Sequence, residues 1–298
     1  MNFSNRKTIF CFAPLLLSAS ALAGYICPHP VDQKQIVFMI AGNGNPAEIE
    51  SAAKAACERG EGFESFPSED LVNSLNQRDA VLKAKWNSYK NRCYQLTNLR
   101  CQTEYSSLAD AQNSLDNDST EICTKETITD KFKGFSEKGT TLTSIVVSAH
   151  DGGGNVHGNF LPHIGKMEII GALKDAYKDK PELLNKLSSV FMWGCWTMGP
   201  SEIQDWKNQL PDLKMMSGFF DMAPLGNMPA SQTVLHDLLS DEKNIEDASD
   251  KEKLKGLIAK ATNINQTYAS VYVQNQCGNN YYYTTTLLIS IRRMAPVM

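Results

Sequence analysis

The chain has 298 residues, of which 42% are hydrophobic and 21% are charged, so its composition is that of a globular protein. Its 29 Lys and Arg residues against 33 Asp and Glu residues give a formal charge of −4, and an acidic chain is a poor partner for nucleic acid. A chain of this length can bury a substantial core in a single domain without a metal or a second subunit.

Residues 1–23 have the pattern of a secretory signal peptide. Basic residues precede an apolar run, and the run ends in small residues with Ala21 and Ala23 spaced as in a cleavage site. We therefore expect residues 24–298 to form an exported protein, in the periplasm or outside the cell. Beyond this segment no stretch reaches the roughly 18 consecutive apolar residues of a membrane-spanning helix, so no membrane span is expected.

The first half of the exported chain opens with a strand and then becomes helical. The continuous apolar run at 36–40 predicts a buried strand, and the Gly-Asn-Gly loop after it predicts its end. Residues 47–59 are rich in Ala and Glu and predict a helix that stops at Gly60. The region at about 68–130 has few β-branched residues and much Gln, Asn, Lys and Leu, which predicts a helical insertion.

Strands and helices alternate in the second half. Residues 144–149 and 189–193 predict buried strands, and an amphipathic helix at 167–177 separates them. A helix at 201–209 and a fourth strand at 213–220 follow. This alternation predicts an α/β fold with a mostly parallel sheet and helices on both faces.

The C-terminal part, about residues 232–298, is helical and then aromatic. The charge run at 241–255 mixes both signs, which predicts a solvated helix. Residues 282–291 are β-prone and predict a final strand. Since no repeat or linker divides the chain, we expect residues 24–298 to form one domain.

A histidine and a cysteine directly follow two of these strands. His150 comes after the strand at 144–149 and opens a glycine-rich bend, and Cys195 follows the strand at 189–193 through Gly194. Ligands of open α/β sheets bind at the carboxyl ends of the strands. If the two strands are neighbours, a thiol and an imidazole meet at one edge, which is the pairing that nucleophilic catalysis needs.

Such a pair would act on a carbonyl group through an acyl intermediate. A thiolate attacks the carbonyl carbon, an imidazole protonates the leaving amine, and backbone N–H groups hold the oxyanion. Glycines let the backbone approach a substrate closely, so Gly152 and Gly194 are the candidate backbone positions of the oxyanion site. His157 is a second candidate base, and we prefer His150 because it lies at the strand end.

The parity of the cysteines supports this assignment. Cys11 lies in the signal segment, which leaves an odd number of the eight cysteines in the exported part. Oxidising compartments favour disulfides, so we expect three bridges and one free thiol, Cys195. The bridges would use the remaining cysteines in a connectivity that the sequence leaves open: Cys27, Cys57, Cys93, Cys101, Cys123 and Cys277.

Two strings resemble the caspase-like cysteine peptidases, the group that contains caspases, legumain, clostripain and gingipain. Residues 148–158, Ser-Ala-His-Asp-Gly-Gly-Gly-Asn-Val-His-Gly, are similar to the strand, Ser-x-His-Gly and glycine turn of that family. Residues 191–195, Phe-Met-Trp-Gly-Cys, are similar to its second block, an apolar strand that ends in a small residue and the catalytic cysteine. The resemblance covers roughly residues 36–227 without the helical insertion, and it implies a caspase-hemoglobinase-like fold.

The resemblance implies an exported cysteine endopeptidase that cleaves proteins or peptides. Cys195 would be the nucleophile and His150 the general acid and base, with the amides of Cys195 and Gly152 as oxyanion donors. We expect no cofactor and no metal, although some relatives use calcium. Two positions depart from the family pattern: Asp151 stands where glycine is usual, and the bulky Trp196 follows the cysteine.

Two residues are candidates for substrate binding. Trp196 lies beside the expected nucleophile. Asp221 follows the fourth strand, and relatives that prefer a basic residue before the scissile bond carry an acidic group in this neighbourhood. The competing interpretation of Asp221 is a solvated loop carboxylate.

Two other functions stay open at this point. The departures at Asp151 and Trp196 are compatible with an inactive caspase-like module that binds a peptide without cleaving it. A metal-dependent hydrolase is a third interpretation, in which His150, Asp151, His157 and His163 would hold the ion. The spacing of these residues is not that of the usual short zinc motifs.

Overall fold

The structure is a computed structural model. It describes residues 25–93, 99–120, 122–151, 154–219, 223, 229–247, 252, 255–256, 269–274, 280–284 and 287–291. The predicted signal peptide lies outside these ranges. Within them, no helix has the length and apolar character needed to cross a membrane.

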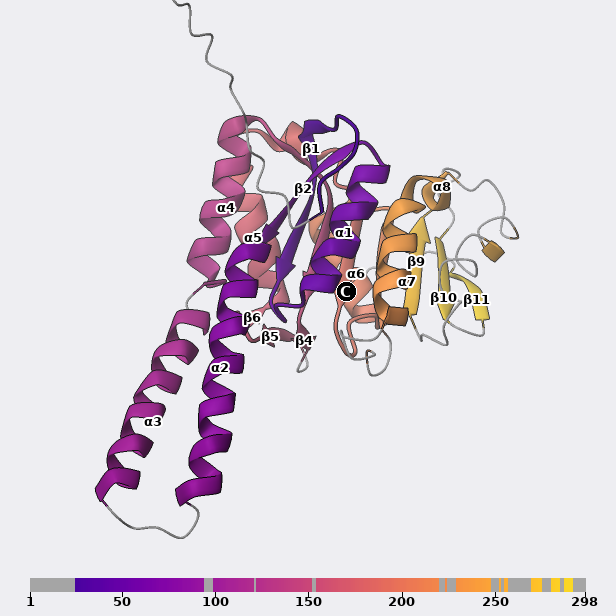
Figure 1. Cartoon of the computed structure of the whole chain (residues 1–298). Coiled ribbons are helices and arrows are strands. Elements are labelled where there is room, and N and C mark those ends of the chain that lie inside the picture. The colour runs from indigo at the N-terminus through magenta and orange to yellow at the C-terminus, as the bar shows by residue number, and fades with distance from the viewer. Residues whose placement is uncertain are drawn as a thin grey trace, which may run out of the picture.

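An eight-stranded sheet forms the centre of the molecule (Figure 1), in the order β11-β10-β9-β8-β7-β3-β1-β2. The parallel part consists of β2 (Glu61–Phe66), β1 (Asp32–Ala41), β3 (Thr141–Ser148), β7 (Ser189–Trp193) and β8 (Met215–Phe219). Three antiparallel strands extend it beyond β8, namely β9 (Ala269–Gln274), β10 (Asn280–Thr284) and β11 (Leu287–Ile291). The predicted α/β class with a mostly parallel sheet is confirmed.

Helices flank the sheet, as the alternating pattern predicts (Figure 1). Two of them pack side by side, α1 (Pro46–Glu58) and α7 (Pro229–Ser240). In a second group, α5 (Lys166–Ala176) contacts both α4 (Lys125–Lys138) and α6 (Pro200–Gln209). Two further helices are short, η1 (Pro181–Leu184) and α8 (Glu242–Glu246).

The core is continuous through the parallel strands because their side chains are apolar on both faces. The side chains of β1 from Val37 to Ala41 are inaccessible to solvent. Phe38 packs edge-on against Phe132 and Phe135 of α4, with ring centroids 5.5 and 5.1 Å apart. Burial of each large apolar side chain stabilises the fold by roughly 1.5–3 kcal/mol, so the strand ends sit on a rigid base.

The helical insertion projects from the body as an arm (Figure 1). It consists of α2 (Glu69–Cys93) and α3 (Leu99–Thr120), which pack against each other. The 25 residues of α2 correspond to a rise of about 37 Å. The arm leaves the body at the edge of the sheet where the small strands β4 to β6 lie.

Two helices differ from the sequence expectations. The insertion was expected to extend to about residue 130, but α4 begins at Lys125 and packs on the sheet, where its Phe132 and Phe135 are buried. The charge run at 241–255 was expected to be solvated, and this is wrong for α8. Its Glu242 is buried and accepts hydrogen bonds from Arg59 at 2.5 Å and from the hydroxyl of Ser144 at 2.7 Å.

Several strands lack a clear signal in the sequence. Charged residues at Glu61 and Glu64 interrupt the apolar pattern of β2. A second, three-stranded sheet is built from β4 (His150–Asp151), β5 (Asn155–Gly158) and β6 (Leu161–Gly165), where we expected only a bend. The final strand expected at 282–291 is instead the antiparallel pair of β10 and β11.

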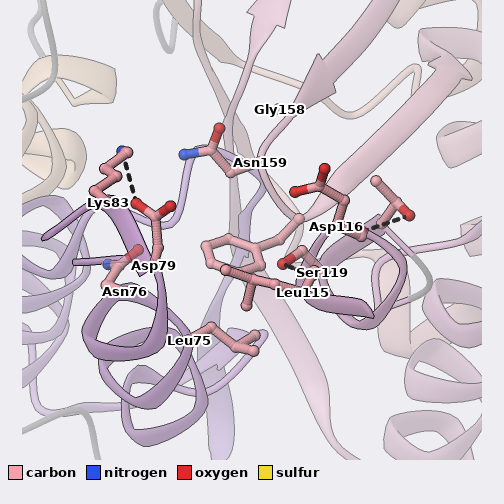
Figure 2. Close-up of a pocket in the computed structure, with 11 residues that line it drawn as sticks. Leu75, Asn76, Asp79, Lys83, Leu115, Asp116, Ser119, Gly158 and Asn159 are labelled. Atoms are coloured by element: carbon pink, nitrogen blue, oxygen red, sulfur yellow. Dashed lines mark hydrogen bonds and ion pairs between the residues drawn. The ribbon is translucent and has the colours of Figure 1, made fainter. Parts of the chain in front are cut away.

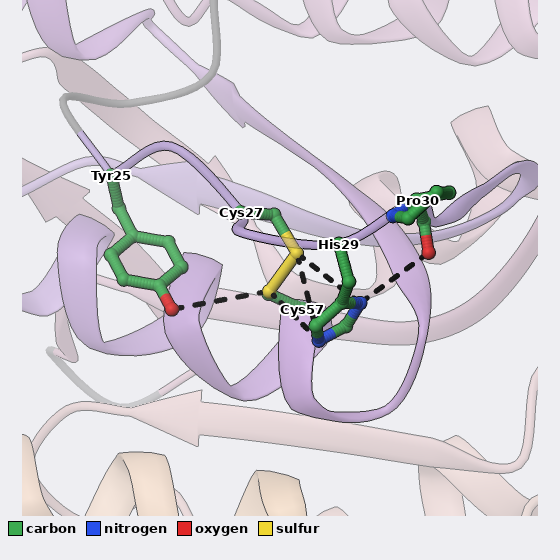
Figure 3. Close-up of a disulfide and its surroundings, with 5 residues drawn as sticks. All are labelled: Tyr25, Cys27, His29, Pro30 and Cys57. Atoms are coloured by element: carbon green, nitrogen blue, oxygen red, sulfur yellow. Dashed lines mark hydrogen bonds between the residues drawn. A yellow bond between two sulfur atoms is a disulfide. The ribbon is translucent and has the colours of Figure 1, made fainter.

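Two disulfides are present among the described residues. Cys27–Cys57 ties the segment before β1 to the last turn of α1, and Figure 3 shows the ring of His29 beside both sulfur atoms. Cys93–Cys101 joins the two helices at the far end of the arm. Disulfides of this kind are typical of exported proteins.

The prediction that Cys123 is disulfide-bonded is wrong. Cys123 is a buried free thiol whose Sγ donates to the carbonyl oxygen of Phe66 at 3.4 Å, and burial raises its pKa well above the usual range. Its expected partners are already joined in the two bridges, except Cys277, which lies outside the described residues. Cys123 therefore serves as a small apolar group between the arm and the body.

Candidate active site

The strands that precede His150 and Cys195 are direct neighbours in the sheet. β3 and β7 pair in parallel, and their last registered pair is Ser148 with Trp193. The N–H of Ala149 then donates to the carbonyl of Trp193 at 3.3 Å. His150 and Cys195 are each the second residue after that registered pair, so both lie where the two strands end at the same edge of the sheet.

Gly194 permits the close approach of the two strand ends. A Cβ atom at this position would lie 2.2 Å from the carbonyl oxygen of Ala149, a separation that real Cβ atoms do not show. The N–H of Gly194 donates to the carbonyl of Met192 at 3.0 Å, so it is not directed at a substrate. Its role is therefore steric: it lets the chain turn tightly before Cys195, and its own N–H is not directed at an oxyanion.

Cys195 is a free, partly exposed thiol, as predicted. Its Sγ accepts a hydrogen bond from the N–H of Ala223 at 3.3 Å. In the described part of the chain, the N–H of Cys195 itself donates no hydrogen bond. This amide is therefore a donor at the turn that an oxyanion could use.

Thr197 fixes the turn that carries Cys195, a role that the sequence analysis missed. Its hydroxyl bridges the carbonyl oxygens of Met192 at 2.7 Å and Gly194 at 2.9 Å. The same oxygen accepts the N–H of Phe219 at the end of β8, at 3.1 Å. A buried Thr two residues after a candidate nucleophile is a signal that could have been used.

Trp196 has a backbone conformation that large side chains rarely adopt. Its φ angle is +49°, in the left-handed region, and its side chain is 53% exposed. Such a conformation costs roughly 1 kcal/mol and persists only where the surrounding structure imposes it. The indole is thus exposed to solvent one residue after Cys195.

His150 belongs to a row of three histidines, one on each strand of the small sheet. It pairs with His157 across β4 and β5, and their ring centroids are 5.6 Å apart. His157 in turn stacks on His163 of β6, at 4.5 Å. Burial lowers the pKa of His157, and the neighbouring charges of His163 and His150 lower it further, which keeps this imidazole neutral near pH 7.

Asp151 supports the glycine turn and does not face the reaction edge as a free carboxylate. It is buried, and it accepts a hydrogen bond from Lys166 at 2.8 Å and from the N–H of Gly154 at 3.1 Å. Lys166 is the first residue of α5, and its own N–H donates to the carbonyl of Gly154. The departure from glycine at Asp151 thus has a structural explanation in this chain.

A buried carboxylic acid lies beneath the strand ends. Glu48, in the first turn of α1, accepts a hydrogen bond from the hydroxyl of Ser148 at 2.5 Å. Burial raises its pKa to about 7. Glu48 was not among the residues expected from the sequence, although an acidic residue next to Ile49 and Ala52 on the apolar side of a helix is a usable signal.

Two of the expected site residues, Gly152 and Asp221, lie outside the described residues. The metal interpretation receives no support from the neighbouring groups, because the carboxylate of Asp151 is already paired with Lys166. Among the described residues, one group of possible metal ligands lies close together, Cys27, His29 and Cys57, and its two sulfur atoms form a disulfide.

No protein-family model matches the chain, and no curated protein shows significant sequence similarity to it. The geometry at the strand ends is therefore the main indication of what the protein does.

Proposed function

We propose that the chain is an exported caspase-like cysteine endopeptidase, with Cys195 as nucleophile and His150 as general acid and base. The observation that carries the proposal is the parallel register of β3 and β7, which puts an imidazole and a free thiol after adjacent strands. Further support comes from the order of the two residues along the chain and from the glycine that precedes the cysteine.

In the proposed reaction the thiol proton moves to His150 and the sulfur of Cys195 attacks the carbonyl carbon of a peptide bond. The N–H of Cys195 stabilises the oxyanion of the tetrahedral intermediate. When the C–N bond breaks, the imidazolium gives its proton to the leaving amine, which forms the acyl-enzyme. His150 then removes a proton from water, whose oxygen attacks the acyl carbon, and the released thiolate takes the proton back.

His150 is the better base of the two adjacent histidines. His157 is one strand further from β7, and its Nδ1 is buried without a hydrogen-bond partner. Because the imidazole of His157 is neutral, it does not repel the positive charge that His150 carries in the acyl-transfer step.

The test is alkylation of the folded, unreduced protein with iodoacetamide at several pH values, with mass spectrometry to locate the adduct. We expect Cys195 to react well before the buried Cys123. His150→Ala should shift the pH midpoint of the reaction upward and abolish the cleavage of a peptide library. His163→Ala is the matched control, since this exposed histidine belongs to the same row and should change neither result. An unreactive or disulfide-bonded Cys195 would refute the proposal.

The inactive peptide-binding module is the second candidate, and the exposed indole of Trp196 is the observation that favours it. In that case Cys195 would be alkylated normally but no peptide in the library would be cleaved. Peptide binding to the protein, with loss of binding in Trp196→Ala, would then identify the module.

A further inference from the structure

The arm and the body enclose a pocket at the root of the arm, which we call the arm-root pocket (Figure 2). Its volume is about 320 Å³. It is lined by residues of α2, α3 and the turn between β5 and β6: Leu75, Asn76, Asp79, Lys83, Leu115, Asp116, Ser119, Thr120, Gly158, Asn159 and Phe160. None of these residues takes part in the reaction proposed above.

We propose that the arm-root pocket binds a lysine or arginine side chain of a polypeptide substrate, about three residues from the bond that is cleaved. The inference rests on the proposed function, and it names a substrate class for the same site. Its basis is the position of the pocket along the sheet edge, the chemistry of its floor, and the charge of its rim.

The position follows from the small sheet. The ring of His157 lies 5.6 Å from that of His150, and Gly158, the next residue, lines the pocket. Gly158 also lies against the carbonyl of Gly42, which directly follows β1. β1, β3 and β7 are consecutive strands of the sheet and neighbouring strands are about 4.8 Å apart, so the near wall of the pocket begins about 10 Å from the end of β7, where Cys195 follows. An extended peptide advances about 3.3 Å per residue, which corresponds to about three residues.

The wall formed by the β5–β6 turn is rigid. The backbone N–H of Phe160 donates to the carbonyl of Gly42 at 2.9 Å, and the side-chain amide of Asn159 donates to the carbonyl of Asn43 at 3.3 Å. A Cβ atom at Gly158 would lie 2.3 Å from the carbonyl oxygen of Gly42, so the turn is pressed against the end of β1. A preformed wall lowers the entropy cost of binding.

The floor of the pocket is apolar and its rim is acidic. Leu75, Leu115 and Phe160 are buried and offer an apolar surface to a long aliphatic stem. Figure 2 shows Asp79 of α2 and Asp116 of α3 on opposite sides of the pocket.

The rim carries one unbalanced negative charge. Asp79 is paired with Lys83 at 2.6 Å, whereas Asp116 accepts a hydrogen bond from the neutral Gln112 at 2.8 Å. Within the described part of the chain, Asp116 has no cationic partner. A side chain with an aliphatic stem and a cationic end satisfies both the floor and the rim, which neither an acidic nor a short polar side chain does.

The experiment uses fluorescence-quenched peptides that share one cleaved sequence, with a single lysine moved through the six positions on either side of the bond. We expect kcat/KM to be about fivefold higher when lysine stands about three residues from the bond on one side, consistent with a partly exposed ion pair. Asp116→Asn should remove this preference and leave the cleavage of the lysine-free peptide unchanged. Asp110→Asn, an exposed carboxylate of α3 outside the pocket, is the matched control.

Asp116→Lys adds a second test that does not depend on loss of function, because the preference should change from lysine to glutamate at the same position. Cleavage without any lysine preference at this distance, or a preference that Asp116→Asn leaves intact, would overturn the inference and leave the peptidase proposal standing. No cleavage together with an unreactive Cys195 would overturn both.

Discussion

The carboxylate of Asp151 and the ammonium group of Lys166 form a buried ion pair of 2.8 Å, and the same carboxylate accepts the N–H of Gly154. These contacts thus tie Asp151, the residue after His150, to Gly154 and to the first residue of α5. The two charges of the ion pair depend on each other, since a buried charge without a partner is strongly unfavourable.

Replacing Asp151 by Ala should therefore destabilise the protein by about 3 kcal/mol, because Lys166 would stay buried without its closest partner. The loop after His150 should also lose its anchor, so Cys195 alkylation at neutral pH should slow. Urea unfolding and the alkylation rate measure the two effects. Asp130→Ala removes an exposed carboxylate that contacts Lys133 at 3.4 Å, and it should cost less than about 0.5 kcal/mol.

A double replacement, Asp151→Leu with Lys166→Met, separates charge from loop support. Apolar side chains of similar size can replace a buried ion pair with little loss of stability. We expect stability to return towards that of the original chain while alkylation of Cys195 stays slow. Full recovery of both would show that the pair does not position the loop.

Gly194→Ala should damage the site through a steric effect. The added Cβ would lie 2.2 Å from the carbonyl oxygen of Ala149, so β3 and β7 would have to separate where His150 and Cys195 follow. We expect a loss of 1–3 kcal/mol, typical of overpacking, and a marked fall in Cys195 alkylation.

Gly171→Ala is the control for that substitution. Gly171 lies inside α5, and a Cβ there would meet no atom within 4 Å. Alanine should stabilise this helix by roughly 0.5–1 kcal/mol. If Gly194→Ala left stability unchanged or raised it, as expected for Gly171→Ala, the steric explanation for Gly194 would be wrong.

The parallel part of the sheet could be predicted from sequence because buried parallel strands are continuous apolar runs. Four of its strands, β1, β3, β7 and β8, have such runs. β2 has the sequence Glu-Gly-Phe-Glu-Ser-Phe, whose charges conceal its burial. The three strands of the small sheet are short and contain His, Gly and Pro, so their pairing comes from tertiary contacts rather than from propensity.

Only those site residues could be predicted whose position follows from the residues next to them in the sequence. His150 and Cys195 could be placed because each directly follows an apolar strand, and strand ends are a place for chemistry in α/β sheets. Glu48 and Lys166 could not, because their contacts, with Ser148 and Asp151, depend on how distant helices pack. The prediction of a disulfide at Cys123 failed for a related reason. The number of cysteines in a chain does not show which of them lie close enough to form a bond.

Glu48 should make stability depend on pH. Its pKa is raised from 4.5 to about 7 by burial, so the folded protein holds a proton that the unfolded chain releases between these values. The resulting stability is complete below pH 4.5 and is lost as the pH rises through 7. At 1.36 kcal/mol per pKa unit the loss is on the order of 3 kcal/mol.

Glu48→Gln, which stays uncharged, should therefore be more stable than the original protein at pH 8 and about equal to it at pH 5. Thermal or urea unfolding at the two pH values measures this difference. Glu50→Gln, on the exposed side of the same helix, should shift stability little and equally at both. A Glu48→Gln variant with no pH-dependent gain would show that the Glu48 carboxyl titrates normally.

Substitutions of Trp196 should have different effects on stability and on peptide cleavage or binding. Its φ angle of +49° suits glycine better than any residue with a Cβ, so Trp196→Gly should be about 1 kcal/mol more stable than Trp196→Ala. Both variants lack the indole. If the indole contacts the substrate, both should cleave or bind peptides more weakly, and to the same extent.

Val81, which is exposed in the middle of α2, is the control position. Val81→Gly should be about 1 kcal/mol less stable than Val81→Ala, because Gly is less favourable than Ala inside a helix. Equal stability of the two Trp196 variants would mean that the surrounding turn relaxes, and unchanged peptide cleavage and binding would remove Trp196 from the substrate site.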